Sequence, residues 1–253
     1  MEVNMNRSHY IRRLSLKRED VPSFERYPFH LPSIKKLTEL EFHPNVTFII
    51  GENGMGKSTL LEAIALSIGF NAEGGTLNFN FSTFDSHSEL ERFVRIAKGT
   101  VRPKDGFFLR AESFYNVAST IQKLDEEPGY GAPVIDSYGG VSLHEQSHGE
   151  AFFATFNHRF RGDGIYILDE PEAALSPLRQ LSMLTRIQEL VTNRSQFIIA
   201  THSPIIMAFP SAKIIELSED GLQEKKLEET NHFQIMKQFF DDKDRLLHHL
   251  FQK

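Results

Sequence analysis

The chain has no cysteine among its 253 residues, so disulfide bonds, thiolate zinc sites and cysteine nucleophiles are excluded. It also has no uninterrupted apolar run close to the roughly 20 residues that a membrane-spanning helix needs. The N-terminal stretch MEVNMNRSHYIRR lacks the apolar segment of a secretion signal. These absences favour a cytoplasmic protein.

An excess of basic charge is missing as well. The chain has 28 Lys and Arg residues and 34 Asp and Glu residues, which gives a formal net charge of -6. This balance disfavours a surface coated with phosphate-binding groups, although it leaves a local basic groove open. A hydrophobic content of 40% over this length is enough for one substantial core, so we expect a single domain over residues 1–253.

The strongest motif follows the apolar run 46–50, which is typical of a buried parallel strand. GENGMGKS then matches the phosphate-loop pattern G-x-x-x-x-G-K-[ST], and the apolar spacing after it predicts a helix over 59–66. Strand, glycine-rich loop and helix are the context that the motif requires. The residues predicted to bind the nucleotide are Gly51, Glu52, Asn53, Gly54, Met55, Gly56, Lys57, Ser58 and Thr59.

Such a loop points backbone N–H groups and a positive helix end at one anion. Lys57 is expected to reach the β- and γ-phosphates, Ser58 to coordinate Mg²⁺, and Thr59 to support the α-phosphate side. The predicted cofactors are therefore ATP and Mg²⁺.

Two further apolar strands are predicted at 164–169 and 196–200. The first ends in Asp169, an expected Mg²⁺ ligand, and Glu170, which is placed to polarise the water that attacks the γ-phosphate. The second is followed by His202 at the ligand-binding edge of an open α/β sheet, where it is expected to contact the γ-phosphate or the water.

Residues 70–150 have a different character. We expect a loop or hairpin first, then a capping box at 86–89 that opens a helix over 89–98, a strand at 107–111, a helix over 114–124 and a Gly/Pro-rich loop. This segment is interpreted as a smaller helical lobe inserted between core segments 1–69 and 151–217. Ser147 is expected to cap a helix over 151–160, which leaves its hydroxyl and the Gly149 N–H at a positive helix end.

Both ends of the chain carry further candidates. The candidates for an aromatic or arginine contact with adenine or phosphate upstream of the loop are Tyr10, Arg12, Arg26 and Tyr27. For any one of them, an ordinary surface or edge role is favoured over this contact. In the C-terminal segment 218–253, the pattern predicts a hairpin of 213–217 with 222–227 and then an amphipathic helix over 231–251. Packing of that helix on the core is favoured over docking to a partner.

The motifs GENGMGKST, QSHGE, YILDEPE, ALSP and THSP occur in this order and resemble those of the ATP-binding-cassette ATPases. The resemblance covers about residues 30–217. It implies an α/β P-loop NTPase core, a mostly parallel sheet flanked by helices, with an inserted helical lobe that carries a signature motif. It implies that Ser147, His148, Gly149 and Glu150 form this signature, that Glu170 is catalytic and that His202 is the switch histidine.

Two features depart from the family pattern. His148 stands where the signature usually has glycine, and no clear glutamine loop follows the phosphate loop. Glu112, after the strand at 107–111, is the candidate that replaces this glutamine as a contact for Mg²⁺ or water.

The motifs DEPEAALSP and THSP resemble those of the soluble branch of the family, which includes chromosome-maintenance, recombination-repair and phage-defence ATPases. Within that branch, they most resemble the motifs of the small AAA family ATPases. This resemblance implies an ATP-hydrolysing enzyme that forms a nucleotide-sandwiched homodimer and acts on an effector protein or nucleic acid. The subunit of a membrane transporter and a directly DNA-binding repair ATPase remain alternatives, and a kinase is a distant one.

Overall fold

The computed structural model describes residues 10–77, 88–111, 113–126 and 132–252. Its centre is a six-stranded sheet in the order β5–β6–β7–β3–β8–β9, in which only the β8–β9 pair is antiparallel. The strands are β5 (Asp105–Arg110), β6 (Gly164–Asp169), β7 (Gln196–Ala200), β3 (Val46–Gly51), β8 (Lys213–Ser218) and β9 (Gly221–Lys225). This mostly parallel α/β arrangement confirms the expected fold class.

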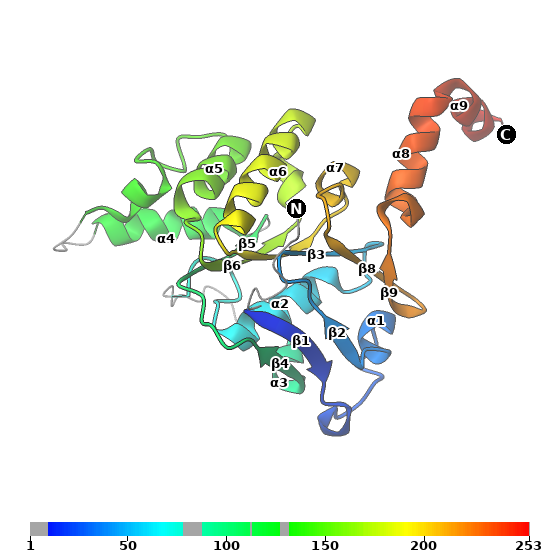
Figure 1. The fold of residues 1–253 in the computed structure, drawn as a ribbon, viewed down its shortest axis with the longest axis horizontal. Coiled ribbons are helices and arrows are strands. Elements are labelled where there is room, and N and C mark those ends of the chain that lie inside the picture. The colour runs from blue at the N-terminus through cyan, green and yellow to red at the C-terminus, as the bar shows by residue number, and fades with distance from the viewer. Residues whose placement is uncertain (1–9, 78–87, 112, 127–131, 253) are drawn as a thin grey trace.

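A second, antiparallel sheet lies below the first in the view of Figure 1. Its order is β2 (Glu39–Glu41), β1 (Ile11–Leu16) and β4 (Val94–Lys98). The helices are α1 (Pro32–Lys35), α2 (Lys57–Ile68), α3 (Leu90–Phe93), α4 (Phe114–Glu126), α5 (His148–Ala154), α6 (Pro177–Thr192), α7 (Pro204–Met207), α8 (Asn231–Asp241) and α9 (Lys243–Phe251).

The central sheet separates two hydrophobic cores because neighbouring residues of a strand point to opposite faces. Phe48 belongs to the core under α4, α5 and α6, and the next residue, Ile49, belongs to the core under α2 and the small sheet. Both side chains are fully buried. Figure 1 shows these helices on the two sides of the sheet. Burial on both faces explains why the strands read as continuous apolar runs.

The structure corrects the expected helix over 89–98. Only Leu90–Phe93 is helical, and Val94–Lys98 is strand β4, paired antiparallel with β1. The segment VRIAK contains the β-branched residues Val94 and Ile96, which favour a strand, and it pairs along the available edge of β1. The first two residues of the expected capping box at 86–89 lie outside the described residues.

Residues 70–150 therefore do not form a purely helical lobe. Strand β5 pairs with β6 in the central sheet and β4 pairs with β1, so both strands of this segment are part of the core sheets. The helices that residues 70–150 contribute above the central sheet are α4 and α5, as Figure 1 shows. The predicted helix over 151–160 begins at His148 and ends in a π-helical turn, Thr155–Arg159.

The C-terminal segment differs from its prediction in one respect. The β8–β9 hairpin is present, but the expected single helix is divided at Asp242 into α8 and α9. Neither helix has a buried residue, and both project from the body in Figure 1. The preference for packing on the core is therefore wrong. No helix within the described ranges is long and apolar enough to cross a bilayer.

Candidate functional site

The phosphate loop lies between β3 and α2, at the carboxyl edge of the central sheet. Gly51 has a φ of 143°, and a Cβ there would lie 2.3 Å from the carbonyl oxygen of Leu217 on β8, so only glycine fits this position. The loop therefore starts where the β3 backbone passes directly against its neighbour.

Lys57 is folded back over this loop. Its side chain is buried, and its Nζ donates hydrogen bonds to the carbonyl oxygens of Gly51 at 2.8 Å and Glu52 at 3.2 Å. Burial lowers the pKa of Lys57, an effect that the nearby carboxylates, first among them Glu170, oppose. Among the remaining loop residues, Asn53 and Gly54 are exposed, whereas Met55 and Gly56 are half-buried.

Ser58 and Asp169 meet at the start of α2. The Ser58 hydroxyl donates to Asp169 Oδ1 at 3.2 Å, which brings together the two predicted Mg²⁺ ligands from positions 111 residues apart. Mg²⁺ in such sites is held by a hydroxyl, one or two carboxylates and substrate phosphates, and this donor set fits that requirement. Glu112, the third candidate ligand, lies outside the described residues. Within those residues there is no cluster of three or more His, Cys, Asp or Glu side chains able to hold a metal by itself.

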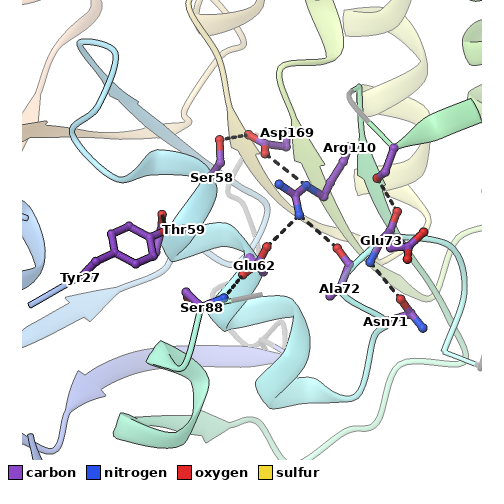
Figure 2. A network of polar contacts seen from close by, with 11 residues as sticks. Tyr27, Ser58, Thr59, Glu62, Asn71, Ala72, Glu73, Ser88, Arg110 and Asp169 are labelled. Atoms are coloured by element: carbon purple, nitrogen blue, oxygen red, sulfur yellow. Dashed lines mark hydrogen bonds and ion pairs between the residues drawn. The ribbon is translucent and has the colours of Figure 1, made fainter. Parts of the chain in front are cut away.

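Arg110, at the end of β5, was not among the predicted site residues. Figure 2 shows its guanidinium between Asp169 and Glu62 of α2. Its Nη1 donates to Glu62 Oε2 at 2.8 Å, and its Nε lies 3.9 Å from Asp169 Oδ2. The ion pair fixes α2, and with it the phosphate loop, against β5 and β6. A charged residue on the buried face of a predicted amphipathic helix, Glu62, was the available sequence signal.

Glu170 follows β6 in the left-handed conformation, with φ 51° and ψ 53°. Its backbone N–H donates to the carbonyl oxygen of Ala200, and its side chain is 42% exposed. A non-glycine residue in this region is strained by about 1 kcal/mol or more, and such residues concentrate at functional sites. The Glu170 Oε1 lies 3.5 Å from Nε2 of His202, so the two predicted catalytic residues do lie together.

Two neighbours of His202 were missed by sequence reasoning. The Glu172 carboxylate accepts a hydrogen bond from the His202 backbone N–H at 2.5 Å, and burial raises the pKa of Glu172. His232, in the first turn of α8, places its Nε2 3.0 Å from Nδ1 of His202. Both histidines have lowered pKa values, chiefly because burial disfavours their charged forms. Nothing in the local sequence pattern marks residues 30 positions away as partners.

The predicted signature residues lie at the start of α5. Ser147 and Glu150 form a capping box, in which the Ser147 hydroxyl donates to Glu150 Oε2 at 2.6 Å. Ser147, His148 and Glu150 are exposed, whereas a Cβ on Gly149 would lie 2.4 Å from the carbonyl oxygen of Ala174. Glycine is therefore needed for the close contact between α5 and the turn after Glu170.

Of the four upstream candidates, Tyr27 forms a hydrogen bond with the phosphate-loop helix. Its hydroxyl lies 3.1 Å from Thr59 Oγ1, and its side chain remains exposed. Tyr10 instead donates to the carbonyl oxygen of Arg194, and Arg26 pairs with Glu89. Arg12 is exposed on β1. Tyr27 is thus the aromatic side chain placed beside the predicted α-phosphate position.

The fold and this constellation define a P-loop ATPase domain. An AAA domain family model matches residues 29–249, and the chain belongs to this family. The match confirms the expected relation to AAA family ATPases, which implies nucleotide binding.

Several solved structures are similar to the chain at low identity. The SMC head domain from Thermotoga maritima is 15% identical, with 85% of this chain and 98% of that chain covered and a TM-score of 0.45. An SMC head bound to the C-winged helix domain of ScpA is 14% identical over 90% and 99%, with a TM-score of 0.49. The dimeric bacterial ABC transporter cassette MJ0796 is 15% identical over 87% and 97%, at 0.47. Identities of this size carry no information about substrate or partner. No curated protein is similar enough to this chain to match it.

Proposed function

We propose that the protein hydrolyses ATP at the carboxyl edge of its central sheet. The observation that carries this proposal is the meeting of four groups there: the Lys57 ammonium, the Ser58–Asp169 pair, the Glu170 carboxylate and the His202 imidazole. Each is of the type that phosphoryl transfer to water uses. The phosphate loop supplies the anion cradle.

In this proposal, the Lys57 ammonium exchanges the carbonyl oxygens of the loop for β- and γ-phosphate oxygens. Ser58 and Asp169 hold Mg²⁺, which supplies neutralisation of the phosphate charge when bound. Glu170 accepts the proton of the attacking water with its partly exposed carboxylate, whose Oε1 lies 3.5 Å from His202 Nε2. His202 donates a hydrogen bond from Nε2 to the γ-phosphate. Exposed Tyr27 provides a ring face for the base.

The proposal extends to a homodimer in which two ATP molecules are sandwiched. Ser147 and His148, at the start of α5, are exposed to solvent, and Gly149 beside them packs against the turn after Glu170. In the dimer, the ATP bound to the partner subunit's phosphate loop would replace Glu150 as the acceptor of the hydrogen bond from the Ser147 hydroxyl. Closure with ATP and opening after hydrolysis would form a switch that acts on an effector protein or nucleic acid. Nothing in the geometry favours a membrane partner.

The deciding experiment is size-exclusion chromatography with light scattering on Glu170→Gln, with and without Mg·ATP. This variant keeps the shape of the side chain and removes the base, so we expect ATP to convert monomer to dimer. Lys57→Ala in the same background is the matched control and should stay monomeric. A Glu170→Gln protein that binds ATP but stays monomeric would rule out the sandwich. Wild-type protein without ATPase activity at any concentration would rule out hydrolysis itself.

A further inference from the structure

The arm formed by α8 and α9 contacts the candidate site through His232. His232 is the second residue of α8, and its Nε2 lies 3.0 Å from Nδ1 of His202, with the ring centroids 5.2 Å apart. The contact joins two chain segments that are otherwise separated by the β8–β9 hairpin. It is a hydrogen bond between two imidazoles, so one nitrogen donates and the other accepts.

The pKa values of both rings lie below the ordinary 6.5, so their neutral forms are favoured at pH 7. Partial burial is the main cause for each, followed by the Lys57 ammonium for His202 and by the His202 ring for His232. A neutral imidazole carries its proton on one nitrogen only, and the bond made by that ring's other nitrogen determines which. The charged or titratable side chains around the pair include Glu52, Lys57, Glu170, Glu172 and Glu216. Within the described part of the chain, the hydrogen-bond partner of His202 Nδ1 is His232 Nε2 and none of these charged side chains.

The other ring nitrogen of His202, Nε2, lies on the side of Glu170, where the γ-phosphate is proposed to bind. This nitrogen is buried, forms no hydrogen bond with any described residue, and lies 3.5 Å from Glu170 Oε1. A buried polar atom without a partner is costly unless a ligand completes it. A γ-phosphate oxygen beside Glu170 needs a donor, so a His202 that serves it must carry its proton on Nε2.

We propose that His232 is a positioning residue that selects this tautomer: its Nε2–H donates to His202 Nδ1 and thereby places the His202 proton on Nε2, toward the nucleotide. The inference rests on the proposed function for the role of the γ-phosphate. It makes the first turn of α8 part of the hydrolytic machinery, so a displacement of the arm removes the donor and changes the state of His202.

The first test is nitrogen-15 NMR of histidine-labelled full-length protein above pH 7, with His202 assigned by loss of its signals in His202→Ala. We expect the wild-type His202 proton on Nε2, and we expect His232→Ala to move a measurable fraction to Nδ1. A wild-type proton on Nδ1, or a tautomer unchanged by His232→Ala, would overturn the inference. This result does not depend on turnover, so it remains decisive even if hydrolysis itself fails.

The second test is steady-state ATPase kinetics. His232→Ala should lower kcat roughly tenfold, the worth of one hydrogen bond to a charged group, with KM unchanged. His232→Gln keeps an N–H donor at a similar position and should restore most of kcat. The control His249→Ala removes an exposed histidine of α9 and should leave both constants unchanged. Equal kcat in wild type and His232→Ala, or equal loss in the Ala and Gln variants, contradicts the role of the donor.

Discussion

Strand β3 and helix α8 are both rich in apolar residues, yet they have opposite surroundings. Every residue of β3 is buried, and Phe48 has no exposed surface. No residue of α8 is buried, and Phe240 is 75% exposed. Helix α8 packs on α9 and on the 3-10 turn before it, whereas β3 lies between β7 and β8 with a core on each face. The apolar pattern of a segment therefore predicts which kind of element it forms. Whether the side chains of that element are buried depends on the elements that pack against it.

The largest expected effect on the free energy of unfolding comes from a substitution in the buried strand β3. Phe48→Ala should lower the free energy of unfolding by about 3–5 kcal/mol, since it removes a fully buried ring from the core under α4 to α6. Denaturant unfolding followed by circular dichroism measures the change. A loss below about 1 kcal/mol would mean that the core closes around the missing ring.

The next effect concerns the ion pair that secures α2 against β5. Arg110→Met should cost about 3 kcal/mol, because it leaves the Glu62 carboxylate without its cation in a site where only 10% of that side chain is exposed. Arg13→Met, which breaks an exposed pair with Glu39, is the matched control and should cost less than about 1 kcal/mol. Similar losses in the two variants would show that the Arg110 pair is not distinct from a surface pair.

A smaller effect is expected from pH at the junction between the site and the arm. The folded-state pKa values of His202 and His232 lie below the ordinary 6.5, so the unfolded chain binds protons more readily. The stability that they contribute is complete above that pH and is lost as pH falls through the lower folded values. Thermal melts from about pH 7 to about pH 5 should show a steeper decline for wild type than for the His202→Ala/His232→Ala double variant. The His249→Ala variant should follow wild type.

The smallest effect is expected in the exposed helix α8, the second element of this comparison. Phe240→Ala makes the same chemical change as Phe48→Ala but at an exposed site, and it should change the free energy of unfolding by less than about 0.5 kcal/mol. The same denaturant titration measures it. A loss of more than 1 kcal/mol would show that the arm packs on the body in solution.

Much of the fold and site could be predicted because their signals are local. The phosphate loop combines a strand, glycines and a helix within one short segment, and Asp169 and Glu170 end a strongly apolar strand. The meeting of Ser58 with Asp169 then follows from the parallel sheet, whose carboxyl ends lie along one edge. The hairpin of β8 and β9 was equally accessible, since its turn and both strands are contiguous.

The remaining features depend on contacts that local patterns do not contain. Segment 94–98 became a strand because the edge of β1 was available, and the Glu62–Arg110 pair joins two elements whose packing had to be known first. The partner of His202 comes from α8, which sequence periodicity assigned to a different role. Whether α8 lies on the core was decided by tertiary packing and not by its amphipathic pattern.

The backbone of Glu170 has a consequence for attempts to engineer the protein. Its left-handed conformation suits asparagine or glycine better than glutamate, so replacement by either should relieve strain and raise the melting temperature while ending hydrolysis. Selection of variants by thermostability alone would therefore favour loss of the side chain that we propose as the catalytic base. Any stabilisation programme for this protein has to screen for turnover at the same time.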